Sequence, residues 1–562
     1  MSTLSYQITL ARTDGTTVQL SNCCAVTDGA VRVVCEVPEG RLQTVKATMP
    51  LRTAGDERIF MNGYQTWTYC PEYTRRDTIR PHAPLPRRAV ERFRLDRYGD
   101  YHFVEYANKP GVTHGFSYCY FRVGEHFRLI GSLDERPGYT IFRYDARANE
   151  LCIERDCALV RCGGELHAFD LFFAAGSEDE VFDAWFAAMG VKPRTTEKIA
   201  GYSSWYNRYQ NIDRQSILRD LRGCASMLRP GDLFQIDDGW EPFVGDWLVP
   251  DAKKFPDGMR AVADAIHAED YRAGLWLAPF VAQEGSAVLR EHPDWFLLHE
   301  GEKWSCGCNW GGFYALDIDR PEVIGYLEKV FSRVFDEWGF DLVKLDFLYG
   351  AAPFGTGEES RAGRMIRAME LLRALCRDKL ILGCGVPVMP AFGLVDYCRV
   401  SCDVGLDWDD KAYMRLIHRE RVSTRQALGN TVFRRQLNGR AYLSDPDVFF
   451  LREENVRLTD EQKELLGTAN SLLGGVLMHS DDMAGYGEEA KARYRALRRN
   501  AAAVNVRVRT DDDWSLTYEL DGREHAVSLN MLKKVRAAKR RARPCGTTIK
   551  ERKRRRNDEI PH

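Results

Sequence analysis

Residues 340–350 read FDLVKLDFLYG, and their apolar side chains run almost without interruption. A short run of this kind is typical of a parallel strand that helices cover on both faces. Lys344 and Asp346 stand inside the run two positions apart, so both point to the same side of the strand. Burying a Lys and an Asp is costly. We therefore expect the two residues either to form a structural ion pair or to have a functional role. The pattern favours a catalytic carboxylate at the carboxyl end of a strand, kept ionised by the neighbouring cation.

The sequence around this strand predicts a (β/α)8 barrel. From about residue 193, strand-like runs alternate with amphipathic helical runs, which is typical of a TIM barrel. Two of the helices are expected over 257–268, where Asp257 would cap the first turn, and over 321–338. The eight expected strands are 201–206, 233–237, 274–279, 342–347, 380–384, 395–400, 441–443 and 475–479.

The remaining parts of the chain read as β structure and a basic tail. Short alternating runs, such as 17–20, 30–34 and 139–143, predict an N-terminal β-sandwich. Strands expected over 505–509, 514–519 and 525–530 predict a short, truncated C-terminal β region. The predicted organisation is a β-sandwich domain at 1–190, the barrel at 191–503, the C-terminal β region at 504–532 and the tail at 533–562.

The net charge of the chain is unevenly distributed, because a basic tail offsets an acidic remainder. Residues 533–556 hold thirteen Lys or Arg and one acid, so they are expected to be disordered and without function. A nucleic-acid-binding arm and a reading-frame change after about Lys534 are the alternatives. The rest of the chain has 66 basic and 80 acidic residues, a net charge of -14, which argues against a nucleic-acid partner.

Composition also bears on location and cofactors. The N-terminus, MSTLSY, lacks the basic start of a signal peptide, and no apolar run approaches the ~20 residues of a membrane span. Sixteen cysteines in a chain of 562 residues need no disulfide framework, and Cys306 and Cys308 lack the second pair that zinc would require. The sequence therefore predicts a cytoplasmic protein with no metal, no cofactor and no membrane partner.

Carboxylates dominate the expected strand ends, and this is what glycoside hydrolysis needs. A retaining enzyme uses two carboxylates about 5 to 5.5 Å apart, one as nucleophile and one as acid/base. Asp346 suits the nucleophile because Lys344 favours its ionised form. Asp403 is a candidate acid/base, with a loop-capping or solvated role as the alternative. Arg399, four residues earlier, could orient a carboxylate or hold substrate.

Asp237 and Asp238 follow the second expected strand and repel each other unless donors are present. Sugar hydroxyls are such donors, and the alternative is a structural Asp-Asp-Gly turn. Trp67, Trp205 and Trp276 could wall a sugar, although each could also be core. Residues 62–69 crowd aromatics into a loop that could instead plug a domain interface. Clustered acids could also hold magnesium, but Lys344 would then sit among the ligands.

Five motifs, in chain order, resemble the α-galactosidases of glycoside hydrolase family 36, or melibiases, and most closely their compact bacterial branch. They are FQIDDGW at 234–240, GLWLAPF at 274–280, KLDF at 344–347, LGCG at 382–385 and Arg399 followed by Asp403. The resemblance covers about 62–530. It implies a β-sandwich, a (β/α)8 barrel, a C-terminal β domain and a metal-free retaining mechanism that removes terminal α-linked galactose.

The resemblance also implies residue roles. Asp346 resembles the nucleophile and Asp403 the acid/base, while Asp237 and Asp238 resemble the pair that reads the 4- and 6-hydroxyls of the sugar. The remaining matches are subsite residues and pocket walls: Lys344, Cys384, Arg399, Trp205, Tyr206, Trp276, and Trp67, which the N-terminal domain lends to the site. The segment before the acid/base reads RVSCD here, whereas relatives more often have RIGPD, but the spacing from Arg399 is kept.

Together these patterns predict a cytoplasmic retaining α-galactosidase that acts on small oligosaccharides such as melibiose or raffinose. Two alternatives keep the same mechanism: hydrolysis of α-N-acetylgalactosaminides, and transfer of galactose to an acceptor sugar. A third is a sugar-binding protein that has lost catalysis, against which the presence of both Asp346 and Asp403 argues.

Overall fold

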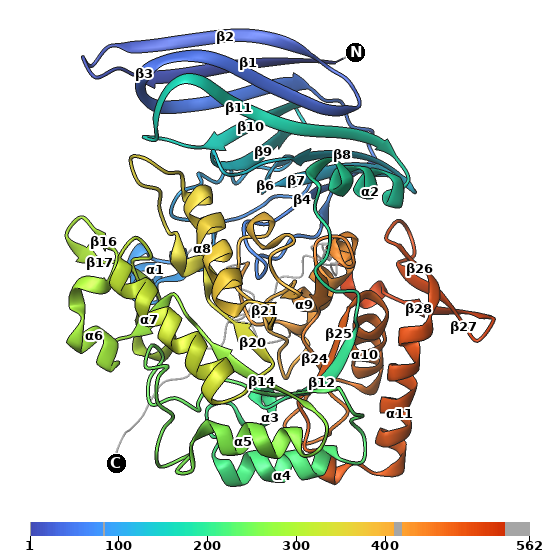
Figure 1. The fold of residues 1–562 in the computed structure, drawn as a ribbon. Helices are drawn as coiled ribbons and strands as arrows, with labels where there is room; N and C mark the ends of the chain where they lie inside the picture. The colour runs from blue at the N-terminus through green and yellow to red at the C-terminus, as the bar shows by residue number, and fades with distance from the viewer. Residues whose placement is uncertain (1, 83–84, 410–418, 534–562) are drawn as a thin grey trace, which may run out of the picture.

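The computed structural model describes residues 2–82, 85–409 and 419–533. The N-terminal strands form a layered sheet at the top of the view in Figure 1, the barrel lies below it, and the last three strands stand beside α11 (Glu488–Arg499). The predicted tail at 533–562 lies outside the described residues except for Lys533, and the domain boundaries drawn from the sequence stay a prediction. None of the helices in the described part combines the length and apolar character of a membrane span.

The N-terminal part is an antiparallel β structure, as expected. Along its longest strand, Val31 and Val33 are buried while Arg32 and Val34 face outward, because successive side chains alternate between the two faces. The helices α1 (Arg87–Arg92) and α2 (Glu178–Met189) accompany it. The strands are β1 (Ser2–Ala11), β2 (Thr17–Val26), β3 (Gly29–Pro50), β4 (Arg58–Met61), β5 (Glu72–Tyr73), β6 (Val112–Phe116), β7 (Tyr118–Val123), β8 (His126–Ser132), β9 (Tyr139–Asp145), β10 (Glu150–Asp156) and β11 (Arg161–Gly176).

The central part is a curled parallel sheet, and all eight strands expected from the sequence are present. They are β12 (Ile199–Ser203), β13 (Leu233–Ile236), β14 (Arg272–Leu277), β20 (Leu342–Leu345), β21 (Leu380–Gly383), β22 (Tyr397–Arg399), β23 (Leu443–Asp445) and β25 (Val476–His479), with β24 (Val448–Phe449) paired to β25. The Gly475 N–H donates to the Ser444 carbonyl at 2.8 Å, which joins the two ends of the sheet. The TIM-barrel prediction is therefore confirmed.

Helices follow the strands, and the longer ones cover the outside of the barrel (Figure 1). They are α3 (Trp205–Arg208), α4 (Arg214–Cys224), α5 (Gly258–His267), α6 (Ala287–Glu291), α7 (Pro321–Ser332), α8 (Arg361–Cys376), α9 (Thr424–Phe433), α10 (Asp460–Leu473) and α11. The helix expected over 321–338 continues past α7 as a π-helical turn. The cap expected at Asp257 is wrong in detail: it precedes α5, but its side chain pairs with Arg214 at 3.1 Å and accepts no hydrogen bond from the helix.

An antiparallel excursion between β14 and α7 was not foreseen. Its strands are β15 (Val281–Gln283), β16 (Leu298–His299), β17 (Glu302–Lys303), β18 (Ser305–Gly307) and β19 (Phe313–Ala315). The three expected C-terminal strands are present as β26 (Val504–Arg509), β27 (Ser515–Leu520) and β28 (Arg523–Ser528). The apolar core runs continuously from the lower face of the N-terminal sheet into the barrel, with Tyr118 and Trp185 on the sheet side of this contact.

Candidate active site

A pocket of about 490 Å³ opens at the carboxyl ends of the barrel strands. Eight of the eleven residues proposed from the sequence line it, and the other three, Tyr206, Cys384 and Arg399, are buried behind the lining. The lining consists of Trp67, Leu95, Tyr98, Trp205, Asp237, Asp238, Trp276, Cys308, Asn309, Trp310, Lys344, Asp346, Phe347, Cys402, Asp403, Glu420, Arg421 and Val422.

The end of β20 supplies Lys344 and Asp346, which share one side of the strand as predicted. Lys344 Nζ forms its ion pair with Oδ2 of Asp237 at 2.8 Å, so the alternative of a structural pair between Lys344 and Asp346 is not what forms, although the charge of Asp346 still acts on Lys344. Burial acts to lower the pKa of Lys344, but the negative charges around it, of which Asp237 and then Asp346 are the largest, together raise the pKa, so the side chain stays an ammonium. Lys344 is therefore the fixed cation at the bottom of the pocket.

Asp346 is oriented by two N–H donors. The indole of Trp276 donates to Oδ2 at 3.1 Å, and the backbone N–H of Phe347 donates to Oδ1 at 2.8 Å. Phe347 has a φ of 52°, a left-handed conformation that is uncommon for a side chain of this size. Its ring packs edge-on against Trp67, with centroids 5.0 Å apart, which holds the strained turn in place.

Asp237 and Asp238 end β13 on a sharp turn. Oδ2 of Asp238 accepts from Gln210 and Trp310, each at 2.9 Å, and the same carboxyl forms a side-chain hydrogen bond with Glu241. Burial, together with the neighbouring charge of Asp237, raises the pKa of Asp238. Gly239 has a φ of 113°, and a Cβ there would lie 2.7 Å from the backbone of Gln210. The turn is thus structural, and Asp238 also lines the pocket.

Asp403 lies across the pocket mouth on the segment after β22. Its carboxylate is about one third exposed (34%), and Arg399 Nη1 lies 3.0 Å from its Oδ1. Burial in the pocket and the charge of Asp346 raise the pKa of Asp403, although Arg399 and Lys344 act in the opposite direction. A carboxyl group whose pKa is raised is suited to hold a proton and deliver it.

The loop between β4 and β5 brings Trp67 from the N-terminal part to the barrel. Its indole donates to Sγ of Cys384 at 3.4 Å, and the neighbouring Thr66 N–H donates to the Val386 carbonyl at 2.9 Å. Both readings of residues 62–69 therefore hold, because the loop docks on the barrel and also contributes a wall to the pocket.

Sequence reasoning missed Trp310, which lies in the excursion after β14. Its indole bonds Asp238, and its backbone has a φ of 54° within the turn η3 (Asn309–Gly311). A Trp inside the glycine-rich run 307–312 was the available signal, since such a run often marks a tight turn that presents a side chain. Asp447 also received no role from the sequence, although Arg399 contacts both its carboxylate and that of Asp403.

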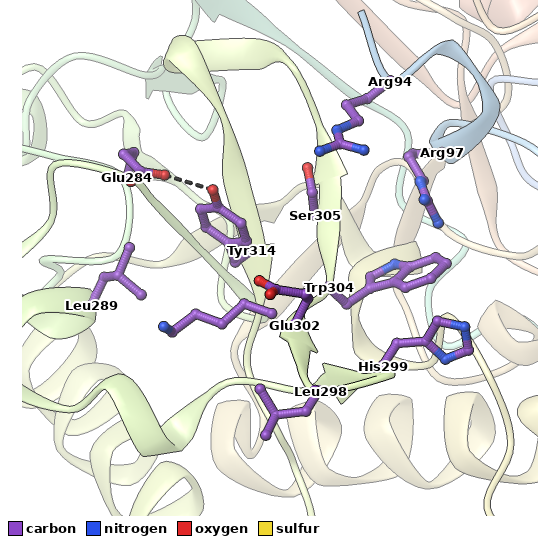
Figure 2. Close-up of a pocket in the computed structure, with 12 residues that line it drawn as sticks. Arg94, Arg97, Glu284, Leu289, Leu298, His299, Glu302, Trp304, Ser305 and Tyr314 are labelled. Atoms are coloured by element: carbon purple, nitrogen blue, oxygen red, sulfur yellow. Dashed lines mark hydrogen bonds between the residues drawn. The ribbon is translucent and has the colours of Figure 1, made fainter. Parts of the chain in front are cut away.

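A second cavity of about 480 Å³ lies on the outer side of the same excursion (Figure 2). Two contacts join residues of its lining: Glu284 accepts from the Tyr314 hydroxyl at 2.6 Å, and the Arg97 guanidinium lies 3.9 Å from the ring centroid of Trp304. None of the residues around it comes from a barrel strand. Among the described residues, the four carboxylates proposed from the sequence line the barrel pocket, and none of them lines this second cavity. Within the same residues, no group of three or more His, Cys, Asp or Glu has the arrangement of a metal site.

Comparisons with known proteins agree with this geometry. A sequence model of the Melibiase family matches residues 202–363. Alpha-galactosidase Mel36A of Lactobacillus acidophilus is 31% identical over 122 residues, which is 20% of this chain and 16% of that protein. An alpha-galactosidase of Escherichia coli is 27% identical over 180 residues, 31% of this chain and 24% of that protein. The matched stretches thus span at most about a quarter of these curated relatives.

Solved structures match over most of the chain. The chain resembles TtGalA, an alpha-galactosidase from Thermus thermophilus in complex with p-nitrophenyl alpha-D-galactopyranoside, with a TM-score of 0.71 and 27% identity, over 90% of this chain and 100% of that one. The GH36 alpha-galactosidase AgaA from Geobacillus stearothermophilus has a TM-score of 0.57 at 13% identity, over 93% of this chain and 74% of that one, and it shows the shared fold alone.

Proposed function

We propose that this chain, which belongs to glycoside hydrolase family 36, is a retaining α-galactosidase that releases terminal α-linked galactose from small oligosaccharides. The observation that supports the proposal most directly is that Asp346 and Asp403 line the same pocket in different environments. Asp346 is fixed by two N–H donors, and Asp403 has a raised pKa and partial exposure. These are the properties of a nucleophile and of an acid/base.

In the first step Asp346 attacks the anomeric carbon, and the bond from that carbon to the leaving oxygen breaks. Asp403 gives its proton to the leaving oxygen, so the aglycone departs as an alcohol. In the second step Asp403, now ionised, takes a proton from water, and the water oxygen displaces Asp346 from the anomeric carbon. Two inversions leave galactose in its original α configuration.

The opposite end of the pocket suits recognition of a sugar. Asp237, charge-paired with Lys344, and Asp238 both line the pocket, and their carboxylates offer acceptors to sugar hydroxyls. Indole rings of Trp205 and Trp276 line the same space. TtGalA has been solved with a p-nitrophenyl α-galactoside and with stachyose, which supports galactosides of this type as substrates here.

The N-acetylgalactosamine alternative is less well supported. It requires a recess for the acetamido group, and the family resemblance places that recess beside Cys384. Cys384 is buried, and a Cβ on Gly385 would lie 2.7 Å from the Trp67 ring, so this wall is closely packed. Galactosyl transfer uses the same first step with a sugar in place of water, and it remains the second candidate because Asp403 serves both acceptors.

We further propose the cytoplasm as the location of the protein. The support is chemical: each cysteine in the described part of the chain is a free thiol, as expected in a reducing compartment.

The first experiment measures nitrophenol release from the α-galactoside, the α-N-acetylgalactosaminide and the α-glucoside, with EDTA present throughout. Clear preference for the α-galactoside supports both the substrate and the absence of a metal requirement. In parallel, Asp346→Asn should lower turnover about a thousandfold or more while the folding transition is kept, because the amide is not a nucleophile. Full activity in that variant would remove Asp346 as nucleophile, and an NMR spectrum showing β-galactose as the first product would refute retention.

A further inference from the structure

Asp447, beyond the end of β23, makes contacts that the proposed reaction has not yet used. The residue is buried, and its backbone has a φ of 76°, the left-handed region that side chains rarely adopt. Its own N–H donates to Oδ1 of Asp445 at 2.8 Å, and its carbonyl accepts from Asn470 at 3.1 Å. A strained, buried carboxylate persists only where the surrounding structure fixes it.

The carboxylate of Asp447 contacts the acid/base segment at two points. Oδ2 accepts from the backbone N–H of Val404, the residue after Asp403, at 2.8 Å. Oδ1 lies 2.9 Å from Nη2 of Arg399, whose Nη1 contacts Asp403. The Tyr206 hydroxyl donates to Oδ2 at 2.5 Å and thereby orients Asp447 itself.

We propose that Asp447 is the positioning residue of the acid/base: it holds the Asp403 segment in its reactive place through the Val404 N–H and through Arg399. This inference rests on the proposed glycosidase reaction and names a residue that acts on it through Asp403. Asp445 also forms an ion pair with Arg399, at 3.0 Å. The Val404 N–H, however, donates to Asp447 and not to Asp445, and this hydrogen bond distinguishes the two carboxylates.

The charge of Asp447 has a consequence for pH dependence. The groups that face it are Arg399, Asp403, Asp445 and Tyr206. Burial, and then the charges of Asp403 and Asp445, raise the pKa of Asp447 to about 6 against the pull of Arg399. Its negative charge makes ionisation of Asp403 less favourable, which keeps the acid protonated to higher pH. Removing the charge of Asp447 ends this repulsion and also leaves Arg399 free to attract Asp403 more strongly. Each of these two changes lowers the pKa of Asp403.

The test compares two substrates and two variants. Asp447→Asn keeps the shape of the side chain, and Asn tolerates the left-handed backbone. The matched control is Asp481→Asn, another buried carboxylate at the barrel rim, which binds the Leu451 and Arg452 N–H groups instead. Melibiose has a poor leaving group that needs the acid, whereas nitrophenol leaves with little help.

We expect Asp447→Asn to lower kcat/KM for melibiose about tenfold more than for the nitrophenyl α-galactoside, and to move the alkaline limb of the pH profile to lower pH. Asp481→Asn should affect both substrates equally. Equal losses for Asp447→Asn on both substrates, with an unmoved alkaline limb, would overturn the proposal. A folded wild-type enzyme inactive on both substrates would instead refute the proposed function. If Asp447→Asn does not fold, Tyr206→Phe should change the substrate ratio in the same direction, and an unchanged ratio would count against Asp447.

Discussion

At the scale of single residues, two buried carboxyl groups, those of Asp238 and Glu241, are in contact beside the pocket. Glu241 is buried and forms a side-chain hydrogen bond with Asp238, while its Oε2 also accepts from the Gly239 N–H at 3.3 Å. Burial and the charge of Asp238 raise the pKa of Glu241 well above its ordinary value. Two carboxyl groups in contact require a proton between them, so Glu241 is the group that carries it.

This predicts a specific pH dependence of stability. Because the folded-state pKa is raised, the contribution of Glu241 is fully present below the ordinary glutamate pKa and is lost as pH rises through the folded-state value. Glu241→Gln keeps a donor to Asp238 and cannot ionise. The melting temperature of this variant should therefore gain on that of the wild type as pH increases from 5 to 9. Parallel melting curves across this range would show that Glu241 does not titrate on unfolding.

Trp310 provides a second residue-scale prediction. Replacing it with Phe removes the N–H donor to Asp238 and keeps an aromatic wall. We expect KM for the nitrophenyl α-galactoside to rise about threefold to tenfold with a smaller change in kcat, because one hydrogen bond to a charged acceptor is lost. Trp304→Phe, in the second cavity, is the control and should leave both constants unchanged. A loss confined to kcat would place Trp310 in the chemical step instead.

At the scale of elements, one arginine joins the loop carrying Trp67 both to the barrel and to the segment of the acid/base. Arg434, buried at the end of α9, donates to the carbonyls of Gln65 at 3.0 Å and Val400 at 2.9 Å, and to Asn62 at 3.2 Å. Val400 immediately follows the Arg399 that holds Asp403. A single side chain thus links the N-terminal wall of the pocket to the segment of the acid/base.

Arg434→Ala should therefore affect both stability and binding. It leaves several buried acceptors without a donor, and we expect a loss of about 3 kcal/mol in the free energy of unfolding, measured with urea. KM should rise because the Trp67 loop is less well held. Arg435→Lys, at the next position, is the control, since Arg435 pairs with the partly exposed Glu178. Destabilisation with an unchanged KM would separate Arg434 from the site.

The same scale explains what could be predicted from the sequence. The barrel strands were predictable because each is a short apolar run, and local pattern determines such elements. The partner of Lys344 was not predictable, because Asp237 directly follows β13, which is two strands away from β20 across β14, and only tertiary structure brings the two residues together. The excursion that carries Trp310 has strands of two or three residues, too short for a periodic signal. The strand expected over 201–206 ends earlier, and the short helix α3 begins at Trp205. This helix was not predicted because it, too, is too short for a periodic signal.

At the scale of the whole molecule, the N-terminal sheet and the barrel share one aromatic contact layer. Phe392 of the barrel packs against Trp185 and Phe186 of α2, with ring centroids 6.0 and 5.3 Å apart, and against Tyr442 at 6.1 Å. Since Trp67 must cross the same interface to reach the pocket, a barrel separated from the sheet would lack one wall of its site. Folding of the two parts and formation of the pocket should therefore be coupled.

Phe392→Ala tests this coupling. Removing a buried aromatic ring from the interface should cost about 3 to 5 kcal/mol. Wild-type protein should unfold in one calorimetric transition that coincides with the loss of activity, because neither part buries its share of the layer alone. In Phe392→Ala, activity should be lost at a lower temperature together with that transition. Phe93→Ala, whose ring is 49% exposed, is the control and should change stability by less than about 0.5 kcal/mol. If activity survived a first transition that melted only the N-terminal strands, the sheet would be dispensable for the site, and the role of Trp67 would fall with it.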